Sequence, residues 1–228
     1  MLRSILLLLL LVAGATQATE WDDVVERAFD AMEDDLSDNF AYTETRRNDD
    51  RVFIGRYDPR FAKGGRWKLT SVDGREPSDD EVEDFLEQKN RVQENKSDDD
   101  TEGIASIVAD GSLVLLSETE AHWLFGFQPA ADTEDEVDFM KFVDGTLMIV
   151  KEGHYVSQIT MQNSQPIKPG KGIKIQEFRT TMDFAPVQEG GPAVPRKIQS
   201  RVRGKAMFVI KINETETLEY SDFVLVAE

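Results

Sequence analysis

Hydrophobic residues recur at two different spacings along the chain. Residues 20–36 carry apolar side chains at helical spacing with acidic residues on the other face, which predicts an amphipathic helix. Its apolar stripe consists of Trp21, Val24, Val25, Ala28, Phe29, Met32 and Leu36. From residue 40 the period changes to two. Residues 40–47 and 51–57 predict a β-hairpin, and residues 66–72 predict a third strand after the Gly64-Gly65 turn.

A second helix is predicted over residues 78–94. Ser78 and Glu81 have the spacing of a capping box, and Val82, Phe85 and Leu86 follow on one face. The acidic residues 95–102 predict a solvated loop, and residues 104–109 predict a short helical turn.

The remainder of the chain predicts strands. Residues 113–127 alternate as one long strand, and residues 146–162 predict a hairpin that turns at Glu152-Gly153. A basic loop is expected over residues 166–172, and further strands are expected over 173–184, 199–212 and 219–227. One face of residues 199–212 holds Val202, Gly204, Ala206, Phe208, Ile210 and Ile212. Because no repeat or Pro/Ser-rich linker divides the chain, residues 19–228 are expected to form a single α+β domain.

The first segment, residues 1–18, predicts a secretory signal peptide. Arg3 precedes an apolar run about half as long as the roughly 20 residues that cross a bilayer, and small residues follow the run. Cleavage after Ala15 or after Ala18 fits the pattern, and an uncleaved anchor is the alternative. Export of a chain without cysteine is typical of the bacterial periplasm, where we expect this protein, with no transmembrane segment in its mature form.

Composition and charge exclude several classes of function. The chain has 26 Lys and Arg against 44 Asp and Glu, which gives a formal net charge of −18 over 228 residues. A nucleic-acid ligand is therefore not expected, because phosphate backbones attract basic surfaces. The absence of cysteine excludes thiol catalysis, disulfides and cysteine-ligated zinc.

Candidate catalytic and metal sites are few. Residues 98–103 match the first six positions of a calcium-binding loop, with oxygen ligands at positions one, three and five and a glycine at position six. Position twelve, where such a loop has a bidentate glutamate, is Ala109. His122 and His154 read as ordinary strand histidines, and no nucleophile, zinc or phosphate-binding motif is present. We therefore expect no catalytic residue, no metal ligand and no cofactor, and a protein that is not an enzyme.

Two features are candidates for binding. Basic residues cluster over 196–211, and Arg201, Arg203 and Lys205 are candidate contacts for an anionic lipid headgroup or an acidic partner. The alternative is that an acidic helix of the same chain, or solvent, covers this cluster. The apolar strand faces either form a packed core or line a cavity for an acyl chain. The candidate lining residues are Phe208, Val202, Ala206, Ile210, Leu115, Trp123 and Phe125.

Several stretches resemble uncharacterised exported proteins of Gram-negative bacteria. They include Phe40-Ala-Tyr-Thr-Glu-Thr-Arg46, Gly65-Arg-Trp-Lys-Leu69, Asp144-Gly-Thr-Leu147, Pro166-Ile-Lys-Pro-Gly-Lys-Gly-Ile-Lys-Ile175 and Tyr220-Ser-Asp-Phe223. The layout is similar to that of the periplasmic outer-membrane lipoprotein carriers with the LolA-like fold. This resemblance implies a strongly curved antiparallel sheet, an incomplete barrel, with helices covering its concave face. It also implies a cavity that accepts lipid acyl chains.

Together these features predict a soluble, monomeric, non-enzymatic periplasmic protein that binds or carries a lipid or lipoprotein acyl chain in a hydrophobic cavity. The alternative is an envelope protein-interaction or sensor module with a filled core and no lipid ligand.

Overall fold

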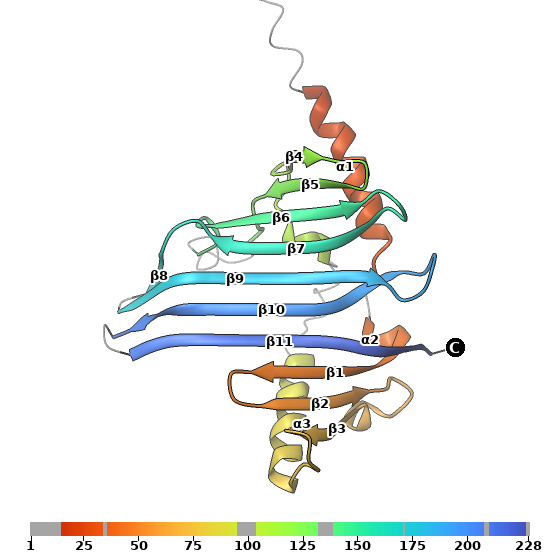
Figure 1. The fold of residues 1–228 in the computed structure, drawn as a ribbon, viewed down its shortest axis with the longest axis vertical. Helices are drawn as coiled ribbons and strands as arrows, with labels where there is room; N and C mark the ends of the chain where they lie inside the picture. Colours follow the sequence, from red (N-terminus) through yellow and green to blue (C-terminus); the bar gives the residue numbers. More distant parts are fainter. Residues whose placement is uncertain are drawn as a thin grey trace, which may run out of the picture.

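One open antiparallel sheet forms the body of the protein. The computed structural model describes residues 15–33, 36–94, 104–131, 139–170, 172–207 and 210–226. The strands are β1 Phe40–Asn48, β2 Val52–Tyr57, β3 Trp67–Val72, β4 Val114–Glu118, β5 His122–Phe127, β6 Val143–Val150, β7 Tyr155–Asn163, β8 Ile167–Gly170, β9 Ile173–Pro186, β10 Ala193–Ala206 and β11 Ile210–Leu225. They form an 11-stranded sheet in the order β3-β2-β1-β11-β10-β9-β7-β6-β5-β4, with β8 paired to β9 (Figure 1).

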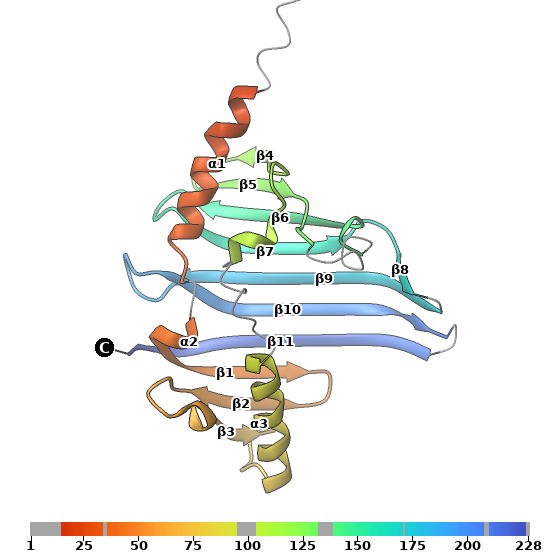
Figure 2. The ribbon, with the colours of Figure 1, turned by 180° about the vertical axis from the view of Figure 1, so that it is seen from behind.

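The two long helices lie on the same face of this sheet. The helices are α1 Ala15–Asp30, α2 Leu36–Asn39 and α3 Asp79–Glu94, and two short 3-10 turns are η1 Lys63–Gly65 and η2 Ile104–Ile107. Helix α1 packs on β7 and η2, and α3 packs on β3 (Figure 2). We call the face that carries the helices the inner face and the opposite face the outer face. This arrangement agrees with the predicted antiparallel sheet with helices on one side.

The apolar stripe of α1 forms the larger core, as predicted. Val25, Ala28 and Phe29 are buried against Phe125 and Leu147 of the sheet. The helix ends at Asp30, however, and does not continue to residue 36. Ala31 and Glu33 instead exchange backbone hydrogen bonds with Ala193, through Ala193 N to Ala31 O at 2.9 Å and Glu33 N to Ala193 O at 2.9 Å. Pairing with the start of β10 therefore replaces the last helical turn.

Helix α3 is capped and packed as predicted. The Ser78 amide donates to Glu81 Oε2 at 2.9 Å, and the Glu81 amide donates to Ser78 Oγ at 3.4 Å, which completes the capping box. Phe85 is buried with Leu69 and Val72. Gly55 of β2 lies directly beneath the Phe85 ring, where a Cβ atom would come within 2.6 Å of the ring, so only glycine fits there.

Two segments that were predicted as single long strands are hairpins. Residues 113–127 divide into β4 and β5, and the turn is held by Thr119 Oγ1, which accepts the His122 amide at 3.0 Å. Residues 199–212 divide into β10 and β11. The alternation continues through the second turn because Ala206 pairs with Ile210, so residues of equal parity share a face on both sides of it.

Other boundaries also differ from the prediction. The expected basic loop at 166–172 contains β8, and the expected last strand at 219–227 belongs to the long strand β11. Residues 1–14 of the predicted signal peptide, the whole of the acidic 95–102 loop and of the 98–103 loop, and Phe208 lie outside the described residues. No helix in the described part of the chain is long and apolar enough to cross a membrane.

Candidate functional site

A single cross-strand row of side chains runs across the width of the inner face. The register places in this row Leu115, Phe125, Leu147, Ile159, Met182, Ile198, Leu218, Arg46, Phe53 and Val72, one from each strand from β4 to β3. All members except Arg46 are apolar. This row is therefore apolar across the whole sheet except at Arg46. The adjacent inner-face positions in the middle of the sheet are polar, with Ser200 paired to Thr180 on one side and to Glu216 on the other.

The two ends of this row are covered, and its middle is only half-covered. Phe125, Leu147 and Ile159 are buried in the core beneath α1, and Val72 is buried beneath α3. Strands β9, β10 and β11 cross the region between the two helices (Figure 2). Their inner faces carry half-buried apolar side chains there. We call this group the floor, and it consists of Phe178, Met182, Ile198, Val202 and Leu218.

The predicted lining residues that the structure describes share the inner face but fall in two separate places. Leu115, Trp123 and Phe125 lie together beneath α1, where the Trp21 ring packs edge-on at 5.6 Å from Phe125 and 6.3 Å from Trp123. Val202 and Ala206 are half-buried on β10, and Ile210 is exposed at the start of β11. The first group is thus part of a filled core, whereas the second lies in and beyond the floor.

A buried ion pair forms a polar wall beside the floor. Lys89 of α3 donates to both carboxylate oxygens of Glu44 on β1, at 2.6 and 2.7 Å, and Nζ lies 4.1 Å from the centre of the Trp67 ring. Burial lowers the pKa of Lys89, and Glu44 opposes this shift. Tyr220 on β11 pairs with Glu44 on β1. Burial raises the pKa of the Tyr220 hydroxyl, and the nearby carboxylates of Glu44 and Glu216 raise it by a smaller amount.

Arg46 joins this wall to the floor. Its guanidinium donates to Glu216 on β11 and to Gln88 on α3, and Arg46 pairs with Leu218 of the floor. This cluster was not predicted from the sequence. A signal was present, because Tyr42, Glu44 and Arg46 alternate on the face of β1 that also carries Phe40.

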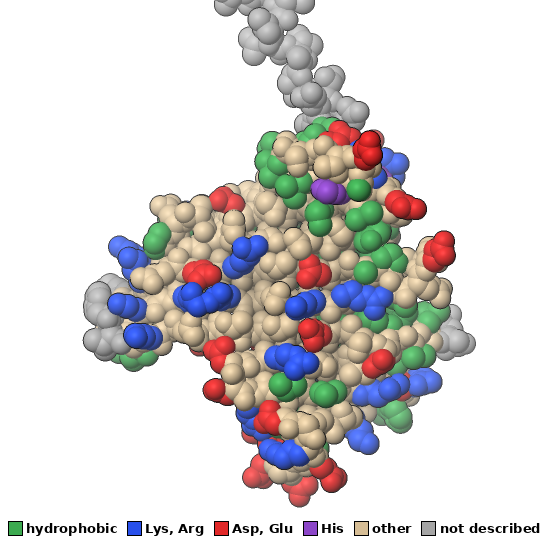
Figure 3. Space-filling model, in the orientation of Figure 1, with side chains coloured by type: hydrophobic (Ala, Val, Ile, Leu, Met, Phe, Trp, Pro, Cys, Tyr) green, Lys and Arg blue, Asp and Glu red, His purple; other side chains and the backbone are tan. Residues whose placement is uncertain are grey.

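The predicted basic residues lie on the outer face, away from the floor. Glu177 is 3.7 Å from Arg201 and 3.4 Å from Arg203, and Asn213 accepts from Arg203 Nε at 3.0 Å. Glu177 of the neighbouring strand β9 therefore neutralises part of the cluster, and no helix contributes to these ion pairs within the described residues. Figure 3 shows Lys and Arg spread over this face with Asp and Glu between them. Lys205 faces Lys211 across the hairpin instead.

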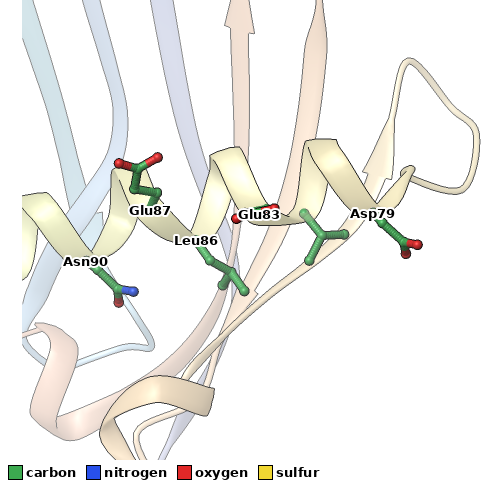
Figure 4. Close-up of a pocket in the computed structure, with 6 residues that line it drawn as sticks. Asp79, Glu83, Leu86, Glu87 and Asn90 are labelled. Atoms are coloured by element: carbon green, nitrogen blue, oxygen red, sulfur yellow. The ribbon is translucent and has the colours of Figure 1, made fainter.

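Helix α3 carries a shallow depression of about 470 Å³ on its exposed side. It is lined by Asp79, Val82, Glu83, Leu86, Glu87 and Asn90. Figure 4 shows that the carboxylates of Asp79, Glu83 and Glu87 point in different directions and do not converge on a common point. A second hollow of about 130 Å³ lies between α3 and the β1–β2 hairpin.

The two histidines lie at or just before the start of strands in the sheet region near α1. His154 Nε2 lies 3.0 Å from the Val24 carbonyl, and its ring packs edge-on against Trp123 at 5.7 Å, so this residue ties the turn after β6 to α1. His122 is half-buried at the start of β5. Within the described ranges, no three His, Asp or Glu side chains form a group that could hold a metal ion.

Comparisons with known proteins do not assign this chain to a family. No family model matches it, and no curated protein matches it. A solved structure of an isomerase-inactive variant of GphF DH1 is 7% identical and covers 92% of this chain and 82% of its own, with a TM-score of 0.18. A similarity this weak carries no argument about fold or function.

Proposed function

We propose that this protein binds the apolar chain of a lipid or lipoprotein on the floor of its inner face and performs no covalent chemistry. The floor is the observation that carries the proposal. Soluble antiparallel sheets place polar residues on a face that meets water and bury the apolar face beneath another layer. Here Ile198, Val202 and Leu218 remain half-buried between α1 and α3. An apolar ligand would complete the layer that the described residues leave incomplete there.

The overall architecture supports the same proposal. An open sheet of 11 strands with both long helices on one face is compatible with the strongly curved, incomplete barrel of the LolA-like lipoprotein carriers. In such a fold the helices lie over the concave face and the ligand lies between helix and sheet. The exported, periplasmic location that residues 1–18 indicate is part of this proposal.

The available free energy is sufficient for useful affinity. Burial of a methylene contributes about 0.8 kcal/mol, so a chain of about twelve methylenes contributes roughly 10 kcal/mol before the costs of association. Micromolar binding therefore requires only that part of such a chain be covered.

The experiment is ligand uptake by the stripped protein. Gently purified protein is first examined by native mass spectrometry for bound lipid, then stripped and titrated with a neutral fluorescent fatty-acid ester. Ile198→Gln and Val202→Gln should each weaken uptake strongly, because each places a polar group beside the chain without a hydrogen-bond partner. Arg203→Gln, on the outer face of the same strand, should leave uptake unchanged.

A filled core is the competing reading, and one observation favours it. Trp21 already fills the space beside Trp123 and Phe125, so the α1 end of the inner face has no room for a chain. If stripped and folded wild-type protein takes up no probe, the lipid-binding proposal fails. The protein is then better described as an envelope interaction module.

A further inference from the structure

The three longest strands extend beyond the rest of the sheet. The last pair between β7 and β9 is Gln162 with Arg179, and the last pair between β1 and β11 is Asn48 with Glu216. Past these pairs, residues 173–178, 201–206 and 210–215 continue as three paired strands, with β8 beside β9. We call this part the projection, and it forms the left side of the sheet in Figure 1. At about 3.3 Å per residue it is roughly 20 Å long.

The end of the projection is held together by close backbone contacts. The Met207 amide donates to the Gly172 carbonyl at 2.7 Å, which ties the turn after β10 to the turn before β9. Met207 has a φ of 49°, in the left-handed region that residues other than glycine and asparagine rarely adopt. Gly204 lies so close to β9 that a Cβ atom there would be 2.4 Å from the Lys174 carbonyl oxygen. Met207 and Gly172 therefore join β10 to the start of β9 at this end.

Lysines are gathered on the outer face of this end. Lys205 pairs with Lys174 on one side and with Lys211 on the other, and all three are exposed. Like charges directly opposite each other destabilise a sheet, so the row has a cost in the free protein. Residues 164–176 and 204–213 together contain five lysines and no Asp or Glu, although the chain has a net charge of −18. Figure 3 shows Lys and Arg side chains at this end.

Apolar side chains are exposed at the same end. Met207 is 73% exposed, Ile210 is 55% exposed and Ile173 is 39% exposed. Ile173 and Ile210 pair with Ala206 and so lie on the inner face, opposite the lysine row. The end of the projection thus combines exposed apolar groups with a row of cations. Peripheral membrane elements have this combination, because apolar groups enter the acyl boundary while lysines contact anionic headgroups.

We propose that the projection docks the protein on an anionic lipid bilayer, with Lys174, Lys205 and Lys211 at the headgroups and Met207 and Ile210 inserted between them. Its length suits an acidic protein. Exposed charges are screened over about 8 Å at physiological salt, so a projection of roughly 20 Å holds the acidic body beyond two screening lengths. A protein partner fits less well, since the end is four strands or about 20 Å across, β8 included, whereas stable interfaces bury about 800 Å² per partner.

The test is co-sedimentation of the full chain with vesicles. The vesicles are an equal mixture of phosphatidylglycerol and phosphatidylcholine, or phosphatidylcholine alone. Wild-type protein should bind the mixed vesicles at low salt, bind them less as salt rises, and bind phosphatidylcholine alone far less. The triple variant Lys174→Gln/Lys205→Gln/Lys211→Gln should lose about a hundredfold in partitioning, since each lysine near an anionic surface is worth about fivefold.

Two further variants separate the projection from general charge effects. Arg56→Gln/Lys63→Gln/Lys68→Gln removes the same charge from exposed residues outside the projection, and it should change partitioning by less than a factor of about three. Met207→Asn keeps a residue that tolerates the left-handed backbone while it removes the apolar side chain, and it should weaken binding several-fold.

Three results would overturn the proposal. The first is no binding of folded wild-type protein to the mixed vesicles at low salt, even if an acidic protein is found to bind the projection. The second is equal binding to both kinds of vesicle. The third is an equal loss in the two triple variants. Because vesicle binding requires no uptake of fatty acid, it can succeed or fail independently of the proposed lipid-binding floor.

Discussion

Removing one partner of the Glu44–Lys89 ion pair should destabilise the protein more than removing both. Glu44 is only 4% exposed, and both of its carboxylate oxygens accept from Lys89 Nζ, at 2.6 and 2.7 Å. A buried charge that loses its counter-charge keeps its full desolvation cost. A pair that is replaced as a whole leaves no such charge behind.

The expected magnitudes follow from the surroundings of each group. Lys89→Met leaves the Glu44 carboxylate buried next to Tyr220, and the free energy of unfolding should fall by about 3–5 kcal/mol. Glu44→Gln leaves the ammonium in place, but the Trp67 ring 4.1 Å away offsets part of the loss, so about 2–3 kcal/mol is expected. The double variant Glu44→Gln/Lys89→Met should lose less than about 2 kcal/mol, which is less than either single variant loses.

The pair should also leave a pH signature. Because burial lowers the pKa of Lys89 below its ordinary value of 10.5, the unfolded chain binds more protons than the folded chain between the two pKa values. The stability of the wild type should therefore rise, relative to that of Lys89→Met, as pH increases through this window towards 10.5. Glu44, Arg46, Glu216 and Tyr220 are the other ionisable groups near Lys89.

Urea unfolding followed by tryptophan fluorescence measures all four members of this cycle. The exposed pair Glu87–Arg91 on the same helix is the matched control, and its coupling should be much smaller, because water screens both groups. Single losses below about 1 kcal/mol with no coupling would mean that water reaches Glu44 and Lys89. Glu44 and Lys89 would then not form a desolvated polar wall.

Three further outcomes test other parts of the fold. Phe29→Ala should lower the free energy of unfolding by about 3–5 kcal/mol, since Phe29 is buried between α1 and the sheet; a loss below about 1 kcal/mol would mean that α1 does not pack as described. The wild-type melting temperature should be higher in molar sodium chloride than at low salt, because the net charge of −18 repels itself; a flat response would indicate local compensation. The hydrogen bond from Arg75 lowers the pKa of Glu81 most, and the hydrogen bond from the Ser78 amide is the second cause. The stability that this carboxylate contributes should therefore be lost as the pH falls below 4.5, the ordinary pKa of a glutamate. A Glu81→Gln variant should lose less stability over that acid range, and an identical acid profile would contradict the capping role.

The local elements could be predicted because each depends on its own segment. The stripe of α1, the capping box of α3 and the β1–β2 and β6–β7 hairpins all followed from spacing within a few residues. The two missed turns, between β4 and β5 and between β10 and β11, leave the alternation of apolar and polar residues unbroken. A turn between Ala206 and Ile210 keeps the parity of the alternation, and the bulge between Leu115 and Ser117 restores it in β4, so neither turn interrupts the period of two.

The missed features of the candidate site depend on contacts between distant segments. Glu44 and Lys89 are far apart in sequence, and they meet only because α3 lies across β1. The position of Arg201 and Arg203 on one face was predictable from alternation, but their neighbour Glu177 comes from β9 and follows from strand order alone. Sequence periodicity gives the face of a residue, whereas its partners follow from the topology.

Strand β10 connects the proposed floor with the proposed membrane contact. Its alternate residues place Ile198 and Val202 on the inner face and Arg201 and Lys205 on the outer face. A shift of one residue in register would exchange the two sets and bring cations onto the apolar floor, which carries a large desolvation cost. The register of β10 is therefore specified by the amphipathic pattern itself. The bulge at Arg203 and Gly204 adds one residue on the β9 side without reversing the faces, so the apolar floor and the lysine row both continue to the end of the projection.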